Sequence, residues 1–387
     1  MPMPTRSSTK MSSEVVARIA PGVASVPAAD WDRCAGTDNP FLSHAFLSAL
    51  EESGSATARA GWQPVPILID GADGRLAAAM PAYAKSHSQG EYVFDQGWAN
   101  AFERAGGSYY PKLQIAVPFT PVPGPRLLTD DPVLASGLIA GAEALVRSNG
   151  LSSAHATFVD PAQVPLFERA GWLIRVDSQF HWHNDGYDSF DAFLDTLASR
   201  KRKAIRKERA SAVEGLRLEQ VTGAALTEAH WDAFWRFYQD TGSRKWGRPY
   251  LTRRFFSLIG ERMADRLLLI FAYRKGEPIA GALNLIGADT LYGRYWGCTE
   301  EVPNLHFEIC YYQAIDAAIE RGLARVEAGA QGGHKLSRGY RPVPTFSAHY
   351  IDNDSFRRAV EDFLERERAA VAGEIAALDE MTPFKRG

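Results

Sequence analysis

The fold is indicated by residues 267–296, which read LLLIFAYRKGEPIAGALNLIGADTLYGRYW. Apolar runs at 267–273 and 279–286 flank a short turn that contains Gly276, and a third apolar run covers 291–296. Short apolar runs separated by turn residues are typical of β-strands joined by tight turns. We therefore expect a β-hairpin followed directly by another strand.

A helix and a further strand come after this stretch. We expect the helix to end at Gly322, and residues 325–328 read as the strand. A long helix at 355–378 then closes the chain. The apolar face of the first helix is formed by Phe307, Tyr311, Ala314, Ile315 and Ile319.

The first half of the chain repeats this order. A hairpin is expected around the turn at Gly74, and a helix that ends at Gly150 precedes another strand. The turn glycines Gly74 and Gly276 lie 202 positions apart, whereas Gly150 and Gly322 lie 172 positions apart. The sequence therefore predicts a structural duplication in which the first half carries additional residues between the two glycines.

The order of hairpin, strand, helix and strand resembles that of the GNAT acyltransferase fold. The resemblance implies a mixed α/β fold of two tandem GNAT-like domains, at 14–180 and 181–387, after a disordered tail at 1–13. In that fold, diverging central strands leave a cleft for an acyl carrier. The N-terminus of a helix receives the carrier's phosphates, because free N–H groups and the helix dipole favour anions there.

Composition narrows the classes of protein to which this chain can belong. The net charge is −3, which gives no general attraction to DNA or membranes, so we expect no DNA partner. The three cysteines stand at no metal-ligand spacing, and their odd number indicates a reducing compartment. Neither a signal peptide nor a membrane span is indicated. We expect a cytoplasmic monomer or homodimer without a metal site.

Four stretches of sequence carry a family resemblance. They are GEYVFD at 90–95, YYPKLQIAVPFTPVPGPRLL at 109–128, RKRKAIRKER at 200–209, and LHFEICYY with GAQGGHK within 305–335. Together they resemble the FemAB-like family of predicted N-acyltransferases, a GNAT-superfamily group linked to peptidoglycan biosynthesis and recognition. The resemblance implies transfer of an acyl or aminoacyl group to an amine, with a peptidoglycan precursor as one candidate acceptor.

Two positions depart from the family pattern, and the loop at 121–125 limits cofactor binding. Gly333 stands where the family usually has Glu, and Gln96 stands where it usually has Trp. The cofactor-binding candidates are Val122, Gly124 and Arg126, which occupy the place of the acetyl-CoA loop. The prolines between them have no N–H to donate, so an anion cradle here would be poor. A stiff structural loop is the alternative interpretation.

The run at 200–209 holds seven Lys or Arg residues in ten positions, within a helix predicted at 199–210. A solvated helix face explains such a run as well as a binding site does. The functional interpretation is that Arg200, Lys201 and Lys203 bind phosphates of a nucleotide-linked precursor or of a charged tRNA. Such binding would depend strongly on salt concentration.

Three residues are predicted to carry the chemistry. Glu308 opens a helix and can take a proton from the attacking amine, although the helix dipole alone would favour a carboxylate there. His334 is a second candidate base, with a structural hydrogen-bonding histidine as the alternative. Lys335 supplies a cation for a developing oxyanion, with a surface ion pair as the alternative.

Other residues are predicted to contact substrate. Tyr110 and Tyr295 are candidate proton donors, and Trp246 can line the cleft by stacking. We add His306, at the start of the helix that carries Glu308, and Lys112, within the second family stretch. Two acidic residues flank a strand predicted to begin at 92–94, and one of them is a further candidate base: Glu91 and Asp95.

Three hypotheses remain open from the sequence. The chain is a GNAT-type enzyme that uses acyl-CoA, or a Fem-type enzyme that uses aminoacyl-tRNA, or a non-catalytic protein that binds a phosphate-rich or cell-wall-precursor ligand. The Pro-rich loop counts against the first, and the lack of a long inserted helical arm counts mildly against the second. We expect no tightly bound cofactor.

Overall fold

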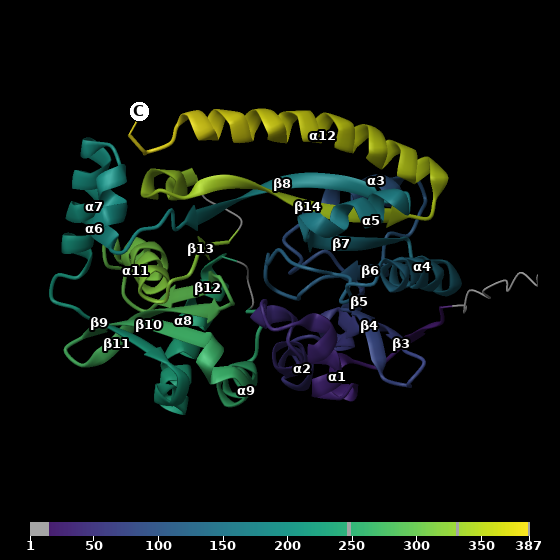
Figure 1. Ribbon diagram of the computed structural model, residues 1–387, viewed down its shortest axis with the longest axis horizontal. Coiled ribbons are helices and arrows are strands. Elements are labelled where there is room, and N and C mark those ends of the chain that lie inside the picture. The colour runs from purple at the N-terminus through teal and green to yellow at the C-terminus, as the bar shows by residue number, and fades with distance from the viewer. Residues whose placement is uncertain (1–14, 246–248, 330–332, 386–387) are drawn as a thin grey trace, which may run out of the picture.

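The computed structural model describes residues 15–245, 249–329 and 333–385. The tail predicted at 1–13 lies outside the described residues, and so does Trp246, which was predicted to contact the substrate. Elsewhere helices and strands alternate along the chain, and helices cover a large central sheet (Figure 1). The molecule is therefore of the mixed α/β class, as predicted.

The first half of the chain extends to a long strand, β8. Its elements are β1 (Ala17–Ile19), α1 (Ala28–Ala35), α2 (His44–Glu52), β2 (Trp62–Pro64), β3 (Ile67–Asp70), β4 (Leu76–Met80), β5 (Ala82–Lys85), α3 (Gln96–Arg104), β6 (Lys112–Ile115), α4 (Pro132–Asn149), β7 (Ser153–Val159), α5 (Val164–Arg169) and β8 (Leu173–His183).

The second half ends in a long helix, α12. Its elements are α6 (Phe190–Thr196), α7 (Ser199–Ala212), β9 (Arg217–Thr222), α8 (Glu228–Lys245), α9 (Arg253–Met263), β10 (Leu267–Arg274), β11 (Glu277–Ile286), β12 (Thr290–Cys298), α10 (Leu305–Phe307), the π-helix η7 (Glu308–Tyr312), α11 (Gln313–Glu320), β13 (Arg325–Glu327), the 3₁₀-helix η8 (Gly333–Arg338), β14 (Arg341–Ile351) and α12 (Asp354–Glu380).

The two halves share one topology. With β2 and α3 left out, the order β1-α1-α2-β3-β4-β5-β6-α4-β7 in the first half matches β9-α8-α9-β10-β11-β12-α11-β13 in the second. Each half contains one parallel strand pair, β6 with β7 and β12 with β13, and a helix connects the two strands of each pair. The predicted duplication is therefore found in the order and pairing of the strands.

The main difference between the halves lies at Pro81. The continuous strand β11 of the second half corresponds to two strands, β4 and β5, in the first half, and Pro81 stands between them. Proline cannot donate a hydrogen bond to a sheet. As a result β4 joins a separate sheet of order β1-β3-β4, whereas β5 joins the eleven-stranded sheet β2-β5-β6-β7-β14-β8-β13-β12-β11-β10-β9.

The last strand of each half completes the sheet of the other half. Strand β8 pairs with β13, and β14 pairs with β7, both antiparallel. The two exchanged strands also pair with each other, from Arg341 opposite His181 to His349 opposite Leu173. Helix α12 lies along both of them (Figure 1). The domain boundary predicted at residue 180 falls within β8 and stays a prediction.

Aromatic side chains hold the halves together on the opposite side of the sheet. Phe46 of α2 meets Phe255 of α9 edge-on, with 5.5 Å between ring centroids, and Phe41 meets Tyr292 of β12 at 5.2 Å. All four belong to one buried cluster that spans both halves. None of the described helices is long and apolar enough to cross a lipid bilayer.

Candidate active site

The central strands of the second half diverge. Strand β12 pairs with β13 only from Thr290 to Tyr292, although β12 itself continues to Cys298. Opposite β11, Asn284 pairs with Gly293 and Leu283 pairs with Tyr295, so Arg294 is the extra residue of a β-bulge. A bulge breaks the ladder locally and redirects side chains, and bulges are frequent beside active sites.

A small pocket lies where these strands separate. Its volume is about 100 Å³, which is room for a small acyl group. Side chains from β11, β12 and the following helix form its walls. The lining residues are Ala282, Asn284, Gly293, Arg294, Tyr295, Trp296, His306, Cys310, Tyr311 and Ala328.

Two buried polar atoms in this pocket lack a partner among the described residues. They are the side-chain oxygen Oδ1 of Asn284 and the Nε of Arg294. The remaining polar atoms are used, because Asn284 Nδ2 donates to the carbonyl of Leu268 and Arg294 Nη2 lies 2.9 Å from Glu327. An unpaired buried donor or acceptor costs about 1–3 kcal/mol. A bound ligand with complementary groups would remove that cost.

Side chains of the π-helix Glu308–Tyr312 face either the pocket or α7. Cys310 and Tyr311 line the pocket. Glu308 and Tyr312 instead contact α7, through Arg209 and Glu208 respectively. Short π-helical turns are uncommon and are often found at functional sites.

Lys335 lies beside the pocket in η8 and is 2% exposed. Its Nζ donates a hydrogen bond of 2.8 Å to the carbonyl of Gly329. Burial, together with the charge of Arg294, lowers the pKa of Lys335 to about 7. An interior without a carboxylate partner favours the neutral amine. Lys335 is thus poised to accept and release a proton near neutral pH.

Two predicted histidines flank the same place. His334 Nε2 and the hydroxyl of Tyr311 share a hydrogen bond of 2.9 Å. The rings of His306 and His334 lie 6.4 Å apart, and His306 also packs edge-on against Trp296. Of the predicted site residues, His306 and Tyr295 line the pocket, His334 is bonded to the pocket residue Tyr311, and Lys335 follows His334 in η8.

Glu308 is placed differently from its predicted partners. Its two carboxylate oxygens accept hydrogen bonds of 3.1 and 3.0 Å from Arg209, and one also accepts from Gln313. The side chain therefore faces α7 and does not line the pocket. These contacts give Glu308 a structural role, which is to attach the π-helix to α7. We therefore assign Glu308 no role in acyl transfer.

The basic run forms α7, as expected, and its side chains differ in their contacts. Arg202 and Arg206 form ion pairs with Asp195 and Asp191 of α6. The predicted phosphate ligands Arg200, Lys201 and Lys203 are exposed and form no ion pair within the part of the chain that the structure describes. Both the solvated face and the phosphate site remain compatible with this arrangement.

In the first half, the predicted loop uses its own polar groups, although Pro123, Gly124 and Pro125 border a cavity of about 650 Å³. Arg126 is fully buried, and its guanidinium donates to the carbonyls of Val122, Gly124 and Thr157, at 2.6, 3.2 and 2.8 Å. Thr157 belongs to β7, the counterpart of β13. The N–H of Gly124 is bonded to Phe158. We therefore do not propose an acyl-carrier site at the predicted loop of Val122, Gly124 and Arg126.

Lys112 and Tyr110 also lie in the first half, away from the pocket. Lys112 is completely buried against Glu91 and Asp95, and the hydroxyl of Tyr110 donates to Ser88. The prediction that a strand begins at 92–94 is wrong, because these residues form an irregular loop. A run of three apolar or aromatic residues suggested the strand, whereas the flanking carboxylates are bound by buried lysines.

The site residues that sequence reasoning missed are Asn284 and Arg294. Their role depends on a bulge and on strand pairing, neither of which has a sequence pattern of its own. Gly293 was the available signal, because a glycine inside a strand often marks a bulge or a close approach.

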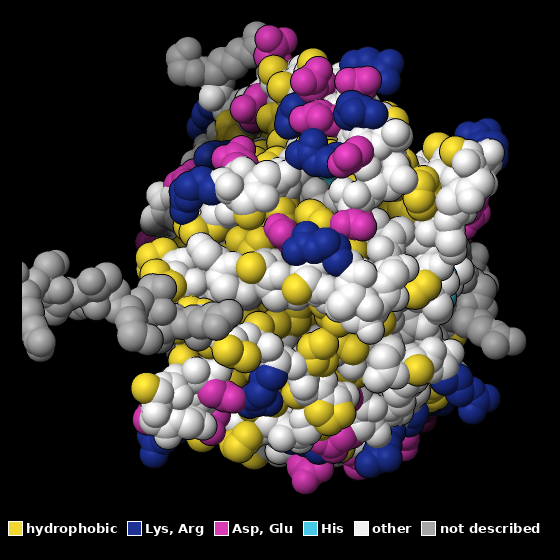
Figure 2. All heavy atoms as spheres, turned by 90° about the vertical axis from the view of Figure 1, so that its right-hand side faces the viewer, with side chains coloured by type: hydrophobic (Ala, Val, Ile, Leu, Met, Phe, Trp, Pro, Cys, Tyr) yellow, Lys and Arg dark blue, Asp and Glu magenta, His cyan; other side chains and the backbone are white. Residues whose placement is uncertain are grey.

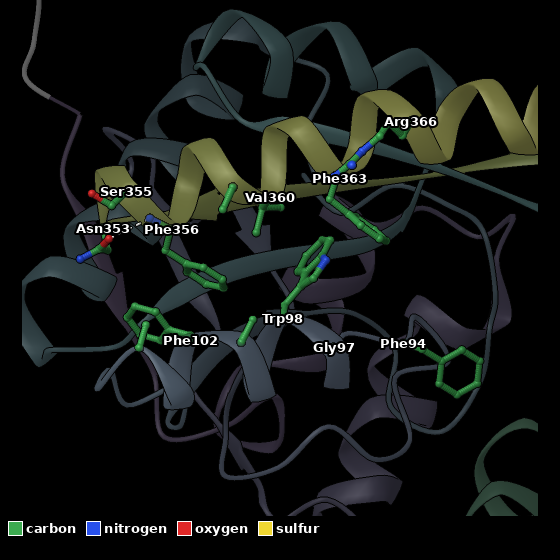
Figure 3. A pocket seen from close by; sticks show the side chains of 13 residues that line it. Phe94, Gly97, Trp98, Phe102, Asn353, Ser355, Phe356, Val360, Phe363 and Arg366 are labelled. Carbon is green, nitrogen blue, oxygen red and sulfur yellow. Dashed lines mark hydrogen bonds between the residues drawn. The ribbon is translucent and has the colours of Figure 1, made fainter.

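Two larger cavities lie elsewhere. One, of about 650 Å³, is lined by residues of both halves. Among them are His181, His183 and Glu327, which is the partner of Arg294. The other, of about 760 Å³, is an apolar groove between α3 and α12 (Figure 3). Its lining includes Trp98, Phe356 and a single charged residue, Arg366, so it offers no group for acyl transfer. Figure 2 shows hydrophobic side chains at the surface on the side of the molecule where, in Figure 1, α12 begins.

Comparison with known proteins agrees with this geometry. A family model described as peptidoglycan biosynthesis/recognition matches residues 22–386. The crystal structure of FemX superposes with a TM-score of 0.55 at 12% identity, over 87% of this chain and 98% of that one. L-PGS from Bacillus licheniformis gives 0.51 at 11% identity, over 86% and 97%. No curated protein matches the sequence.

A third structure supports the same fold. The C-terminal domain of a putative lysylphosphatidylglycerol synthetase from Agrobacterium fabrum gives a TM-score of 0.53 at 10% identity, over 87% of this chain and 96% of that one. At such identities the likeness establishes the fold alone. The predicted fold of two tandem GNAT-like halves is thereby confirmed.

Proposed function

The chain belongs to the FemAB-like family, and from this premise we propose that it is an N-acyltransferase that moves an acyl or aminoacyl group to an amine. The observation that carries the proposal is Lys335, a buried amine with a pKa of about 7 beside the pocket. Arg294 lines that pocket, and its buried Nε has no hydrogen-bond partner among the described residues.

Lys335 and Arg294 have different roles in the proposed reaction. The carbonyl of a bound ester or thioester occupies the pocket, and the acceptor nitrogen attacks it. A C–N bond forms and the C–O or C–S bond breaks, so that the alcohol or thiol part of the donor leaves. The proton lost by the amine passes to the neutral Lys335, and the protonated Lys335 returns a proton to the departing oxygen or sulfur. Arg294 Nε donates to the oxygen that gains negative charge in the tetrahedral intermediate.

The donor and the acceptor are assigned by class. FemX and L-PGS share the fold, and the family description names peptidoglycan. We therefore place aminoacyl-tRNA and acyl-CoA as candidate donors and a peptidoglycan precursor as the candidate acceptor. The exposed cations of α7 would hold the phosphates of either a tRNA or a nucleotide-linked precursor.

A binding protein without turnover is the second candidate. It is favoured by Arg126, which is buried and bonds the carbonyls of the predicted cofactor loop, and by Glu308, whose oxygens are held by Arg209. Such a protein would bind the same precursor but transfer nothing to it. The two candidates therefore differ in catalysis and not in ligand.

The test is the variant Lys335→Met. It replaces the amine by an apolar side chain of similar length, so the fold should be retained. We expect transfer from acetyl-CoA or alanyl-tRNA to a UDP-linked muropeptide to fall by about 10²-fold or more, as is typical when a general base is removed. The matched control is Lys385→Met at an exposed lysine, which should keep full activity.

Two outcomes would contradict the proposal that the protein is an enzyme. A Lys335→Met protein with unchanged turnover would exclude the role of the lysine. A wild-type protein that binds the muropeptide but transfers no group from either donor would favour the binding protein.

A further inference from the structure

Two helices that lie outside the duplicated core border the apolar groove. Helix α3 belongs to the connection at 86–111 between β5 and β6, whereas the corresponding strands β11 and β12 are joined by residues 287–289 alone. Helix α12 follows β14, the last strand of the chain. Neither helix takes part in the order of elements that the two halves share, so the repeated fold does not explain the groove between them.

The two helices meet through aromatic pairs and leave a gap between them (Figure 3). Phe102 stacks on Phe356 with 4.4 Å between ring centroids, and Trp98 meets Phe363 edge-on at 6.2 Å. Small residues on both helices line the rest of the groove: Gly97, Ala101, Ala105 and Ala359. Because these residues cannot fill the space, a volume of about 760 Å³ stays open. Pockets for small molecules usually measure about 300–1,000 Å³.

The groove leaves two aromatic rings in contact with water. Phe94 is 55% exposed and Phe363 is 39% exposed, and both line the groove. Covering such rings with apolar groups is favourable because it removes apolar surface from water. The part of a ligand that lies in the groove is therefore apolar.

A cation stands at one end of the groove. Arg366 is the single charged residue of the lining and lies one turn beyond Phe363 (Figure 3). It is exposed and forms no ion pair with any residue that the structure describes.

Two acidic residues of the same helix do not neutralise this cation. Glu367 is held by Arg175 at 2.6 Å, and Asp362 meets Arg366 only through its backbone carbonyl, at 3.2 Å. The guanidinium is thus available to an anion, and its planar set of N–H groups matches the two oxygens of a carboxylate.

The positions of the rings and of the cation set the length of the ligand. Phe356 and Arg366 are ten positions apart on α12. This spacing corresponds to about 15 Å along the helix axis, which is about the length of an extended dodecanoate chain.

We propose that the groove binds a long-chain fatty acid, with its chain along Trp98, Phe356 and Phe363 and its carboxylate on Arg366. The inference does not depend on the proposed function, because the groove and the small pocket share no lining residue. A second copy of the chain or a membrane surface would also cover the exposed rings. Neither needs the space that the small residues leave between the helices, whereas a single alkyl chain fills it.

The test is a calorimetric titration of the whole chain with dodecanoate below its micelle concentration. We expect one molecule to bind, and the affinity to fall by up to about four-fold for each methylene removed in decanoate and octanoate. Dodecyltrimethylammonium has the same chain and the opposite charge, so it should bind more weakly than dodecanoate.

One pair of variants tests the space between the helices. Ala359→Leu places a larger side chain in the groove, whereas Ala376→Leu enlarges an exposed alanine of the same helix that does not line it. Both proteins should fold, because Ala and Leu are strong helix formers. Ala359→Leu should weaken dodecanoate binding at least about ten-fold, since the chain loses its space. Ala376→Leu should bind as the wild type does.

A second pair tests the cation. Arg366→Gln should weaken dodecanoate binding by about two- to five-fold, which is the effect of one exposed ion pair. It should leave the binding of uncharged methyl dodecanoate unchanged. Arg358→Gln, at an exposed arginine of α12 that does not line the groove, should change neither affinity.

Several results would overturn the inference. The first is a lack of dodecanoate binding, or equal binding in the wild type and in Ala359→Leu. The second is binding of dodecyltrimethylammonium as tight as that of dodecanoate. Binding to phosphatidylglycerol vesicles that Ala359→Leu abolishes and dodecanoate does not compete with would assign the groove to a membrane surface instead. A dimer in sedimentation that Ala359→Leu dissociates and dodecanoate does not would assign it to a second copy of the chain.

Discussion

At the scale of single residues, Lys335 differs from an ordinary lysine because its amine is buried and pairs with no carboxylate of the described residues. Its pKa is about 7, against 10.5 for a lysine in water. The protein interior therefore favours the neutral amine, which is the form that can accept a proton from an attacking nucleophile.

The pH dependence of the reaction follows from this pKa. We expect kcat/KM to rise as the pH increases through about 7, because only the neutral Lys335 can act as the base. Measured rates from about pH 5.5 to about pH 9 should show this inflection in the wild type and in Lys385→Met, and not in Lys335→Met. A rate that falls as the pH rises through this range would contradict the role.

Stability should change with pH in the same direction. The pKa of Lys335 is lowered in the folded state, so the unfolded chain holds a proton on this lysine at pH values where the folded chain does not. The contribution to the free energy of unfolding therefore rises as the pH increases from about 7 toward 10.5. Lys85, whose pKa is also lowered to about 7, contributes with the same sign.

The sequence identified part of this site. His334 and Lys335 were predicted because they stand in a stretch that resembles the family, and both lie at the pocket or beside it. Arg294 and Asn284 were not predicted, because a bulge in β12 brings them to the pocket. Glu308 looked like a base from its position at the start of a helix. The deciding fact, the salt bridge to Arg209, links residues 99 positions apart.

At the scale of secondary-structure elements, α7 carries both charged side chains that form ion pairs with neighbouring elements and charged side chains that are exposed. Arg209 is fixed by Glu308 and Asp316, whereas Lys201, Lys203 and Lys207 are exposed. The fixed arginine attaches the helix to η7 and α11, and η7 contains two residues of the pocket wall. Phosphates bound to the exposed lysines would thus lie on a helix that is attached to the elements of the pocket wall.

Replacement of the exposed lysines tests that arrangement. The triple variant Lys201→Gln, Lys203→Gln and Lys207→Gln keeps the helix, because Gln and Lys have similar helix propensity. Its affinity for tRNA should fall, and the slope of log K against log salt should become shallower by up to about 0.7–0.9 for each phosphate that the variant no longer neutralises. Titrations between about 50 and 200 mM salt measure both quantities.

The control for this experiment is a double variant at lysines outside α7. Lys275→Gln with Lys385→Gln removes charge from the turn between β10 and β11 and from the end of the described chain. It should leave the salt slope unchanged. If the triple variant binds tRNA and a UDP-linked muropeptide as the wild type does, the run is a solvated helix face.

Elements with strong periodicity were predicted well, and the loop at 92–94 was not. The hairpin of β10 and β11 lies where the apolar runs and Gly276 placed it. At 92–94 the same kind of pattern was misleading, because Glu91 and Asp95 are bound by lysines from β5 and β6. Local pattern gives no sign of partners that come from other strands.

At the scale of the whole molecule, the exchange of β8 and β14 makes each half depend on the other. The duplication itself was visible in the spacing of turn glycines. The exchange was not, because the pairing of β8 with β13 and of β14 with β7 joins segments far apart in sequence. Such long-range pairings leave no periodic signal along the chain.

This exchange leads to the last prediction, which concerns cooperativity. Removal of one half would leave the backbone of β7 or β13 without its neighbour in the sheet, and it would expose the aromatic cluster that contains Phe46 and Phe255. Unpaired backbone groups and uncovered apolar surface both destabilise a fragment. We therefore expect a single unfolding transition in urea, with fluorescence and far-ultraviolet circular dichroism changing together. Two separate transitions, or a stable fragment that ends at the predicted boundary at residue 180, would show that the halves fold independently. In that case Phe119 and Tyr295, which share a hydrogen bond across the two halves, would be brought together by docking of finished domains. A one-step transition would instead mean that the pocket forms only as the whole sheet forms.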